Sequence, residues 1–311
     1  MNSPLAFIVV EDRRNKALLL CRESAALAGE QLIVLSGTDA GPDYARFRDA
    51  YVHLSSNSPE FEMVCFRRYF LLAKYLAAHP ECRRFVLIDS DVLLFRGVGA
   101  HIGRLAGAAD FCGSCLRLRD GWDPCQISPH VSYWTSAGLL HFVAHVLDTY
   151  TTPGGLKKLR EIAAQFAAKG VRGGVSDMTL LYLWAHATGN AAPINRVFDG
   201  GVIDHNINGG SNLLANEFRV RGGAKRIEEI DGHPCLTATA TGEAIRVMAL
   251  HFQGSAKMAM QPALHGHVRT MASLIYLMLM ARIAKNHMFS ITARARRAFD
   301  ARRVASARAM K

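Results

Sequence analysis

The sequence lacks an apolar run long enough to cross a membrane. The longest candidate, Met271 to Ala281, has about half of the roughly 20 residues that a spanning helix needs. Pro4 to Val10 is too short for the core of a secretory signal and continues directly into Glu11 and Asp12. The cysteine count is seven, and an odd number without such a signal favours reduced thiols over a disulfide framework. We therefore expect a cytoplasmic protein.

Several catalytic motifs are also missing. The chain has no Gly-x-x-x-x-Gly-Lys-Ser/Thr phosphate loop and no Gly-x-Ser-x-Gly nucleophile elbow. Cys112, Cys115 and Cys125 have no fourth ligand at the spacing typical of zinc fingers. A nucleotidyltransferase, the alternative enzyme class, would need a glycine-rich basic loop after the first strand. The segment from Glu11 to Arg14 is not such a loop.

Positive charge is concentrated at the end of the chain. The formal net charge is +11, and residues 282–311 hold nine Lys and Arg against Asp300 alone, a local balance of +8. A basic nucleic-acid-binding non-enzyme is therefore a second alternative. No recognisable nucleic-acid motif accompanies the charge, so we expect no nucleic-acid partner. Two roles stay open for this tail: a helix on an anionic membrane surface, or an apolar half packed on the core with a solvated end.

The order of apolar runs predicts an α/β fold. Hydrophobic residues make up 50% of the sequence, enough to fill a large core. Strand, helix and strand patterns alternate, which is typical of a mostly parallel central sheet flanked by helices. We expect residues 1–265 to form one domain and residues 266–311 an apolar and basic helical extension. The expected strands are Leu5 to Val10, Gln31 to Leu35, Phe85 to Ile88, Val92 to Phe95, around Val202, and Val247 to Phe252; the expected helices are Asn15 to Ala28, Phe61 to Ala78, Ser136 to Tyr150, Leu156 to Lys169 and Ser176 to His186.

A carboxylate pair directly follows one of these strands. Asp89 and Asp91 are two residues apart, so on an extended chain both side chains point the same way. Open α/β sheets bind ligands at the carboxyl ends of their strands. Asp-x-Asp is common in solvated loops, but here it adjoins the apolar run Phe85 to Ile88, where unpaired carboxylates would be costly. The pattern predicts a Mn²⁺ or Mg²⁺ site with positions open to phosphate oxygens.

Four segments in fixed order carry a family resemblance: Cys65 to Leu71, Phe85 to Phe95, Ser176 to Leu181, and Leu250 to Lys257. This series resembles the glycogenin-like and bacterial lipooligosaccharide galactosyltransferase group, which has the nucleotide-diphospho-sugar transferase (GT-A) fold. The resemblance implies a hexosyltransferase of polysaccharide biosynthesis that uses a nucleotide-sugar donor, of the UDP-sugar class, and a glycan or lipid-linked acceptor. It also implies that Asp89, Asp91 and His251 bind Mn²⁺.

The same resemblance supplies the donor contacts. Gly254 would let the backbone approach the diphosphate, and Lys257 would place a cation beside it. Lys257 is followed by Met258-Ala259 where the family has Pro-Trp. An arginine on the helix before the metal strand would contact the donor; Arg68 is preferred, with Arg67 as the alternative. The predicted donor-binding residues are Arg68, Ser90, Gly254 and Lys257.

The sugar and acceptor residues are predicted on weaker patterns. Asp177 resembles the acidic residue that contacts the transferred sugar, and is assigned as catalytic; the alternative is a helix-terminal aspartate stabilised by the helix dipole. Asn206 and Asn208 lie in a glycine-containing stretch that suits a sugar or acceptor loop, or a plain turn. Ser136 is placed in the sugar pocket, where the family has Asn-x-Gly. Trp134 beside it is expected to pack in the core.

Overall fold

The computed structural model describes residues 5–115 and 125–267, together with 271, 273, 274, 276, 277, 280 and 281. Its central sheet has six strands, and β6 alone among them runs against the others. The predicted α/β fold with a mostly parallel central sheet is confirmed. The strand order is β2 (Leu32–Leu35), β1 (Ala6–Val10), β3 (Arg84–Ile88), β6 (Ile127–Thr135), β5 (Phe111–Cys115) and β7 (Ala191–Pro193).

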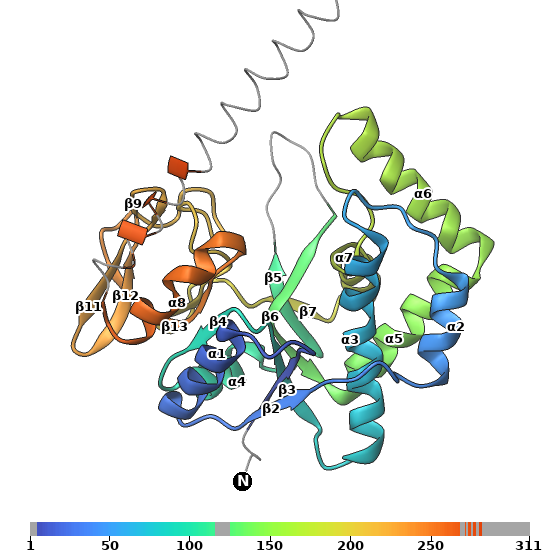
Figure 1. The fold of residues 1–311 in the computed structure, drawn as a ribbon, viewed down its shortest axis with the longest axis horizontal. Coiled ribbons are helices and arrows are strands. Elements are labelled where there is room, and N and C mark those ends of the chain that lie inside the picture. Colours follow the sequence, from blue (N-terminus) through green and yellow to red (C-terminus); the bar gives the residue numbers. More distant parts are fainter. Residues whose placement is uncertain are drawn as a thin grey trace, which may run out of the picture.

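Helices cover both faces of this sheet, as Figure 1 shows. Successive side chains on a strand point to opposite faces, so Phe85 and Leu87 join one core while Val86 and Ile88 join another. A strand buried on both faces reads as a continuous apolar run. The first core lies under α2 (Pro42–Ala50), α3 (Pro59–Ala78), α5 (Ser136–Thr151), α6 (Pro153–Ala168) and α7 (Asp177–Thr188); the second lies under α1 (Lys16–Ala28) and α4 (Val98–Ala106).

The helix boundaries follow from local capping. The Asn15 side chain accepts a hydrogen bond from the Leu18 N–H and begins α1, which ends at Gly29 with φ of 78°. Thr152 caps α6 in the same way, and Pro153 occupies its first turn. Helix α6 therefore begins three residues earlier than the expected Leu156, while the other expected helices are confirmed within two residues.

A second sheet stands beside the first and carries its own core. Strand β4 (Val92–Leu94) pairs antiparallel with β13 (Ala244–His251), placing Val92 opposite His251. The expected late strands around Val202 and at Val247 to Phe252 are confirmed, as β8 (Gly201–Ile203) and β13. The remaining elements are β11 (Ile227–Ile230), β12 (His233–Thr237), β8 (Gly201–Ile203), the hairpin of β9 (Val220–Arg221) and β10 (Ala224–Lys225), the 3₁₀ helix η1 (Gly254–Ala259) and α8 (Met260–Leu264).

The basic tail predicted at residues 282–311 lies outside the described residues, so its membrane contact and the domain boundary near residue 265 stay predictions. Within the part of the chain that the structure describes, no helix is both long and apolar enough to span a bilayer.

Candidate metal centre

Three side chains capable of binding a metal converge where the two sheets meet. Asp89, Asp91 and His251 each offer one ligand atom, and these atoms lie within 4.8 Å of one another. Asp89 follows the last residue of β3, and its N–H donates to the His130 carbonyl at 2.8 Å. The Phe252 N–H donates to the Asp91 carbonyl at 2.9 Å, which extends the β4–β13 pairing. Residues about 160 positions apart are thereby brought side by side.

The geometry of His251 suits a metal ligand. Its Nδ1 lies 2.6 Å from the His205 carbonyl oxygen, which can only accept, so Nδ1 carries the hydrogen. Nε2 faces Asp91, 3.6 Å from Oδ1. Two carboxylates and one imidazole that is held through Nδ1 form a donor set that fits a divalent ion such as Mn²⁺.

Two cationic side chains reach the same carboxylates. Lys257 Nζ lies 3.0 Å from Asp91 Oδ2. Arg68 donates to Asp89 Oδ1 at 2.9 Å and also to Asp177 Oδ2, so one guanidinium links both acids. Its neighbour Arg67 pairs with Asp12 instead. Of the two arginines considered from the sequence, Arg68 is the one that contacts the carboxylates of this site.

Asp177 is held rigidly at the start of α7. Its side chain is only 4% exposed, and Oδ2 accepts hydrogen bonds from Arg68 and from the Tyr69 hydroxyl, the latter at 2.9 Å. It is also the first residue of the helix, so the dipole alternative describes its position equally well. Through Arg68, Asp177 is connected to Asp89, one of the three metal-binding candidates.

Ser90 contacts Glu11, a residue that the sequence analysis did not assign to the site. Its hydroxyl donates to Glu11 Oε2 at 2.8 Å, while Arg13 donates to Glu11 Oε1 from its side chain and backbone. Burial raises the pKa of Glu11, but these hydrogen bonds outweigh it and lower the pKa to about 2. Glu11 immediately follows β1, which pairs in parallel with β3. Its position at the end of that strand was the one sequence feature that could have placed it near Asp89 and Ser90.

The loop of residues 204–210 lies against the end of β13. Asn206 donates through its side-chain amide to Gln253 Oε1 at 2.6 Å, and the Asn208 N–H donates to Asn206 Oδ1. Gly254 follows with φ of 63°, a conformation that favours glycine, and the space where a Cβ would stand is open. Asn206, Asn208 and Gly254 are thus gathered beside His251.

Ser136 is not brought to this site, contrary to its placement in the sugar pocket. Its hydroxyl donates to the Cys82 carbonyl and its N–H to the Arg83 carbonyl, at the amino end of β3. Asp89 follows the opposite end, and five residues of extended strand span roughly 16 Å. Trp134 is fully buried, which confirms its expected place in the core.

Burial controls the charge of the groups around the ligands. It raises the pKa of Asp89, opposed by the Arg68 guanidinium and reinforced by the neighbouring Asp91 carboxylate. His130 stacks on the His251 ring with centroids 4.1 Å apart and planes within 16°. Burial, then His251 and His205, hold the pKa of His130 well below its usual value, so this imidazole is neutral. A neutral ring can stack on a metal ligand without repelling the cation.

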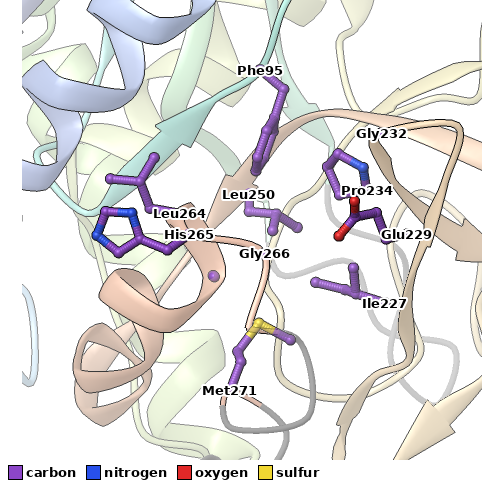
Figure 2. A pocket seen from close by; sticks show the side chains of 11 residues that line it. Phe95, Ile227, Glu229, Gly232, Pro234, Leu250, Leu264, His265, Gly266 and Met271 are labelled. Carbon is purple, nitrogen blue, oxygen red and sulfur yellow. The ribbon is translucent and has the colours of Figure 1, made fainter.

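A cavity of about 310 Å³ lies elsewhere in the second sheet (Figure 2). Leu250 and Phe95 line it together with Glu229 and His265, and none of the three metal-binding candidates does. Leu250 precedes His251 on β13, so the two side chains point to opposite faces of the strand. The cavity is therefore separate from the metal centre.

No protein-family model and no curated protein matches the chain. Solved structures similar to it include glycosyltransferases. The galactosyltransferase LgtC, in complex with donor and acceptor sugar analogues, is 13% identical, with a TM-score of 0.45 over 87% of this chain and 95% of its own. Mouse xyloside xylosyltransferase 1 is 11% identical, with a TM-score of 0.40 over 60% and 83%. A glycosyltransferase involved in glycosylating the PBCV-1 major capsid is 9% identical, with a TM-score of 0.35 over 64% and 85%.

Proposed function

We propose that this chain is a divalent-metal-dependent glycosyltransferase. It would move a hexosyl unit from a nucleotide-diphosphate sugar, of the UDP-sugar class, to a glycan or lipid-linked acceptor. The observation that carries the proposal is the convergence of Asp89, Asp91 and His251 within 4.8 Å at the carboxyl end of a parallel strand. The four motif segments quoted from the sequence support the same class.

We assign the diphosphate of the donor to the metal ligands and Lys257. Asp89, Asp91 and His251 would hold a Mn²⁺ or Mg²⁺ ion, which would supply positive charge beside the diphosphate leaving group. The Lys257 side chain is 42% exposed, so it can turn from Asp91 toward a phosphate oxygen. Gly254 leaves open space in which the backbone can approach the same group.

We assign the sugar end of the donor to Asp177 and Arg68. Arg68 and Tyr69 both donate to Asp177 Oδ2, which leaves Oδ1 to accept a hydroxyl of the sugar. Arg68 keeps Asp89 and Asp177 at a fixed separation by binding both. Its two-pronged contact positions the two acids before the donor arrives, which is the arrangement that lowers the entropic cost of reaction.

We place the acceptor beside the loop of residues 204–210. Asn208 is exposed there, and Asn206 is anchored to Gln253, directly before Gly254. Amide side chains can donate to and accept from sugar hydroxyls, which suits a glycan acceptor. Ser90 is assigned to the nucleotide end, since its hydroxyl joins the metal motif to Glu11 after β1.

A donor screen tests the function. The full chain, freed of metal by a chelator, is incubated with UDP-sugars and GDP-sugars plus Mn²⁺ or Mg²⁺, and nucleotide release is measured. We expect release from a UDP-sugar only with added metal, and a loss of about 100-fold or more in Asp91→Asn. Asp39→Asn, which changes an exposed carboxylate paired with Lys74, serves as the matched control and keeps full activity. Equal activity in Asp91→Asn, or activity in excess chelator, would contradict the proposal.

A further inference from the structure

A fully buried ion pair lies behind the metal centre. Lys225 Nζ is 2.8 Å from Asp204 Oδ1, and both side chains are 0% exposed. Removing two charges from water costs free energy that their attraction often fails to recover, so such a pair is weak support for stability. The role of this ion pair therefore lies in the groups that it holds in place rather than in stability.

The Lys225–Asp204 pair holds the loop that follows β8 on both sides of His205. Lys225 binds the Asp204 carboxylate and also donates to the Asn206 carbonyl, so it clamps the residues on either side of His205. The Asp204 N–H donates to the Ala249 carbonyl at 2.9 Å, which ties the loop to β13. His205 has little freedom to move between these anchors.

His205 in turn orients the side chain of His251. Its carbonyl accepts from His251 Nδ1 at 2.6 Å, and this bond holds the imidazole with Nε2 directed toward Asp91. The His251 backbone is held by the same loop: its N–H lies 3.4 Å from Asp204 Oδ2, and its carbonyl accepts from Ile207 at 3.1 Å. Outer groups that orient a ligating histidine in this way affect metal affinity strongly.

The backbone already attaches the β9–β10 hairpin to this loop without the ion pair. The Lys225 N–H donates to the Ile207 carbonyl at 2.8 Å, and Ala224 forms a bridge with Asn208. The ammonium group is therefore not needed to dock the hairpin. Its two oxygen partners both belong to the residues that flank His205.

We propose that the buried Lys225–Asp204 pair is a positioning device for His251. It holds the His205 carbonyl where it fixes the imidazole with Nε2 free to bind the divalent ion. Lys225 and Asp204 act through His251 and touch neither donor nor metal. The inference rests on the proposed function, since it presumes that Asp89, Asp91 and His251 bind a cation.

Titration of the metal-free full chain with Mn²⁺ by calorimetry tests the inference. We expect Lys225→Met to weaken Mn²⁺ binding about 10-fold or more. Lys74→Met is the matched control, because it removes a Lys–Asp pair of similar length, 2.7 Å, that is exposed rather than buried; its affinity stays at the wild-type value. Unchanged affinity in Lys225→Met overturns the inference.

A double-mutant cycle separates positioning from general loss of structure. In the His251→Ala background the ligand is already gone, so adding Lys225→Met should cause no further loss of Mn²⁺ affinity. An equal fold-loss in both backgrounds overturns the inference. If Lys225→Met does not fold, Lys225→Met with Asp204→Asn removes both charges together, and the same comparison applies.

Asp91→Asn distinguishes the two proposals. If the wild type binds no Mn²⁺, or Asp91→Asn binds it equally well, the metal centre and the positioning device fail together. If binding depends on Asp91 and not on Lys225, the proposed function stands and the inference fails.

Discussion

Glu11 joins the first strand to the metal motif through a single side chain. Arg13 Nε lies 2.8 Å from Oε1, and the Ser90 hydroxyl lies 2.8 Å from Oε2. Both partners bind the ionised carboxylate, and together with the Arg13 backbone they overcome the effect of burial and lower the pKa from 4.5 to about 2. The folded protein therefore holds this proton less tightly than the unfolded chain does.

The stabilising effect of Glu11 should depend on pH. A depressed pKa stabilises the fold above the unfolded value of 4.5, and this contribution is lost as pH falls toward 2, where both states become protonated. We expect Glu11→Gln to be less stable than the wild type at pH 7, with a difference that narrows between pH 4.5 and pH 2. Urea unfolding across this range measures it. A difference independent of pH would show that the charge is not responsible.

Sequence position and spacing singled out the three metal-binding candidates but not the residues that contact them. Asp89 and Asp91 could be predicted because they follow an apolar strand, and His251 because of its spacing from Lys257. The sequence gives no comparable signal for His130 or Lys225. Their roles arise from contacts across the fold: the His130 ring stacks on His251, and Lys225 reaches a carboxylate 21 positions earlier.

At the scale of elements, two loops cooperate to place the start of α7. Ser56 donates to the Gly173 carbonyl at 2.9 Å, and Val175 donates to the Leu54 carbonyl at 2.9 Å. Gly174 lies between, with φ of 136°, and a Cβ there would stand 2.3 Å from the Leu54 carbonyl oxygen. The Leu54 carbonyl is part of the backbone, so it cannot move aside to relieve this clash as a flexible side chain could. The pairing that precedes Asp177 therefore requires glycine at this position.

We expect Gly174→Ala to lower the free energy of unfolding by about 2–3 kcal/mol, because strain and the backbone clash act together. Gly154→Ala is the matched control: Gly154 lies in α6, its φ is not positive, and nothing stands within 4 Å of the added Cβ. That variant should stay within about 0.5 kcal/mol of the wild type. Denaturant unfolding of the three proteins compares them, and equal stability of both variants would refute the role of the loop pairing.

The elements that could be predicted share one property, a clear apolar pattern. Strand β3 is buried on both faces and reads as an unbroken apolar run, and α1 has an asparagine cap and a terminal glycine. Strand β11 has the sequence Ile-Glu-Glu-Ile, with Ile230 40% exposed, so it shows neither alternation nor a continuous apolar run. It is a strand because β12 pairs with it, which no local pattern reveals.

At the scale of the whole molecule, the candidate metal centre lies where two sheets meet, and residues of β3, β4 and β13 also pack there in one buried cluster. Asp89 follows β3 of the central sheet, His251 ends β13 of the second, and Asp91 lies in the short connection before β4. A cation bound by all three would tie the sheets together. It would have no such site in the unfolded chain, so its binding free energy adds to the stability of the fold.

Mn²⁺ should therefore raise the melting temperature of the chelator-treated protein. Free metal at about 100 times its Kd adds about 2.7 kcal/mol, which corresponds to roughly 4 °C for a chain of this length. Asp91→Asn should lose the shift because a ligand is gone, whereas Asp39→Asn, with its exposed carboxylate, should keep it. Calorimetric melting with and without Mn²⁺ measures all three. A full shift in Asp91→Asn would mean that the metal stabilises the protein from another place, and that no cation bound to Asp91 links the two sheets.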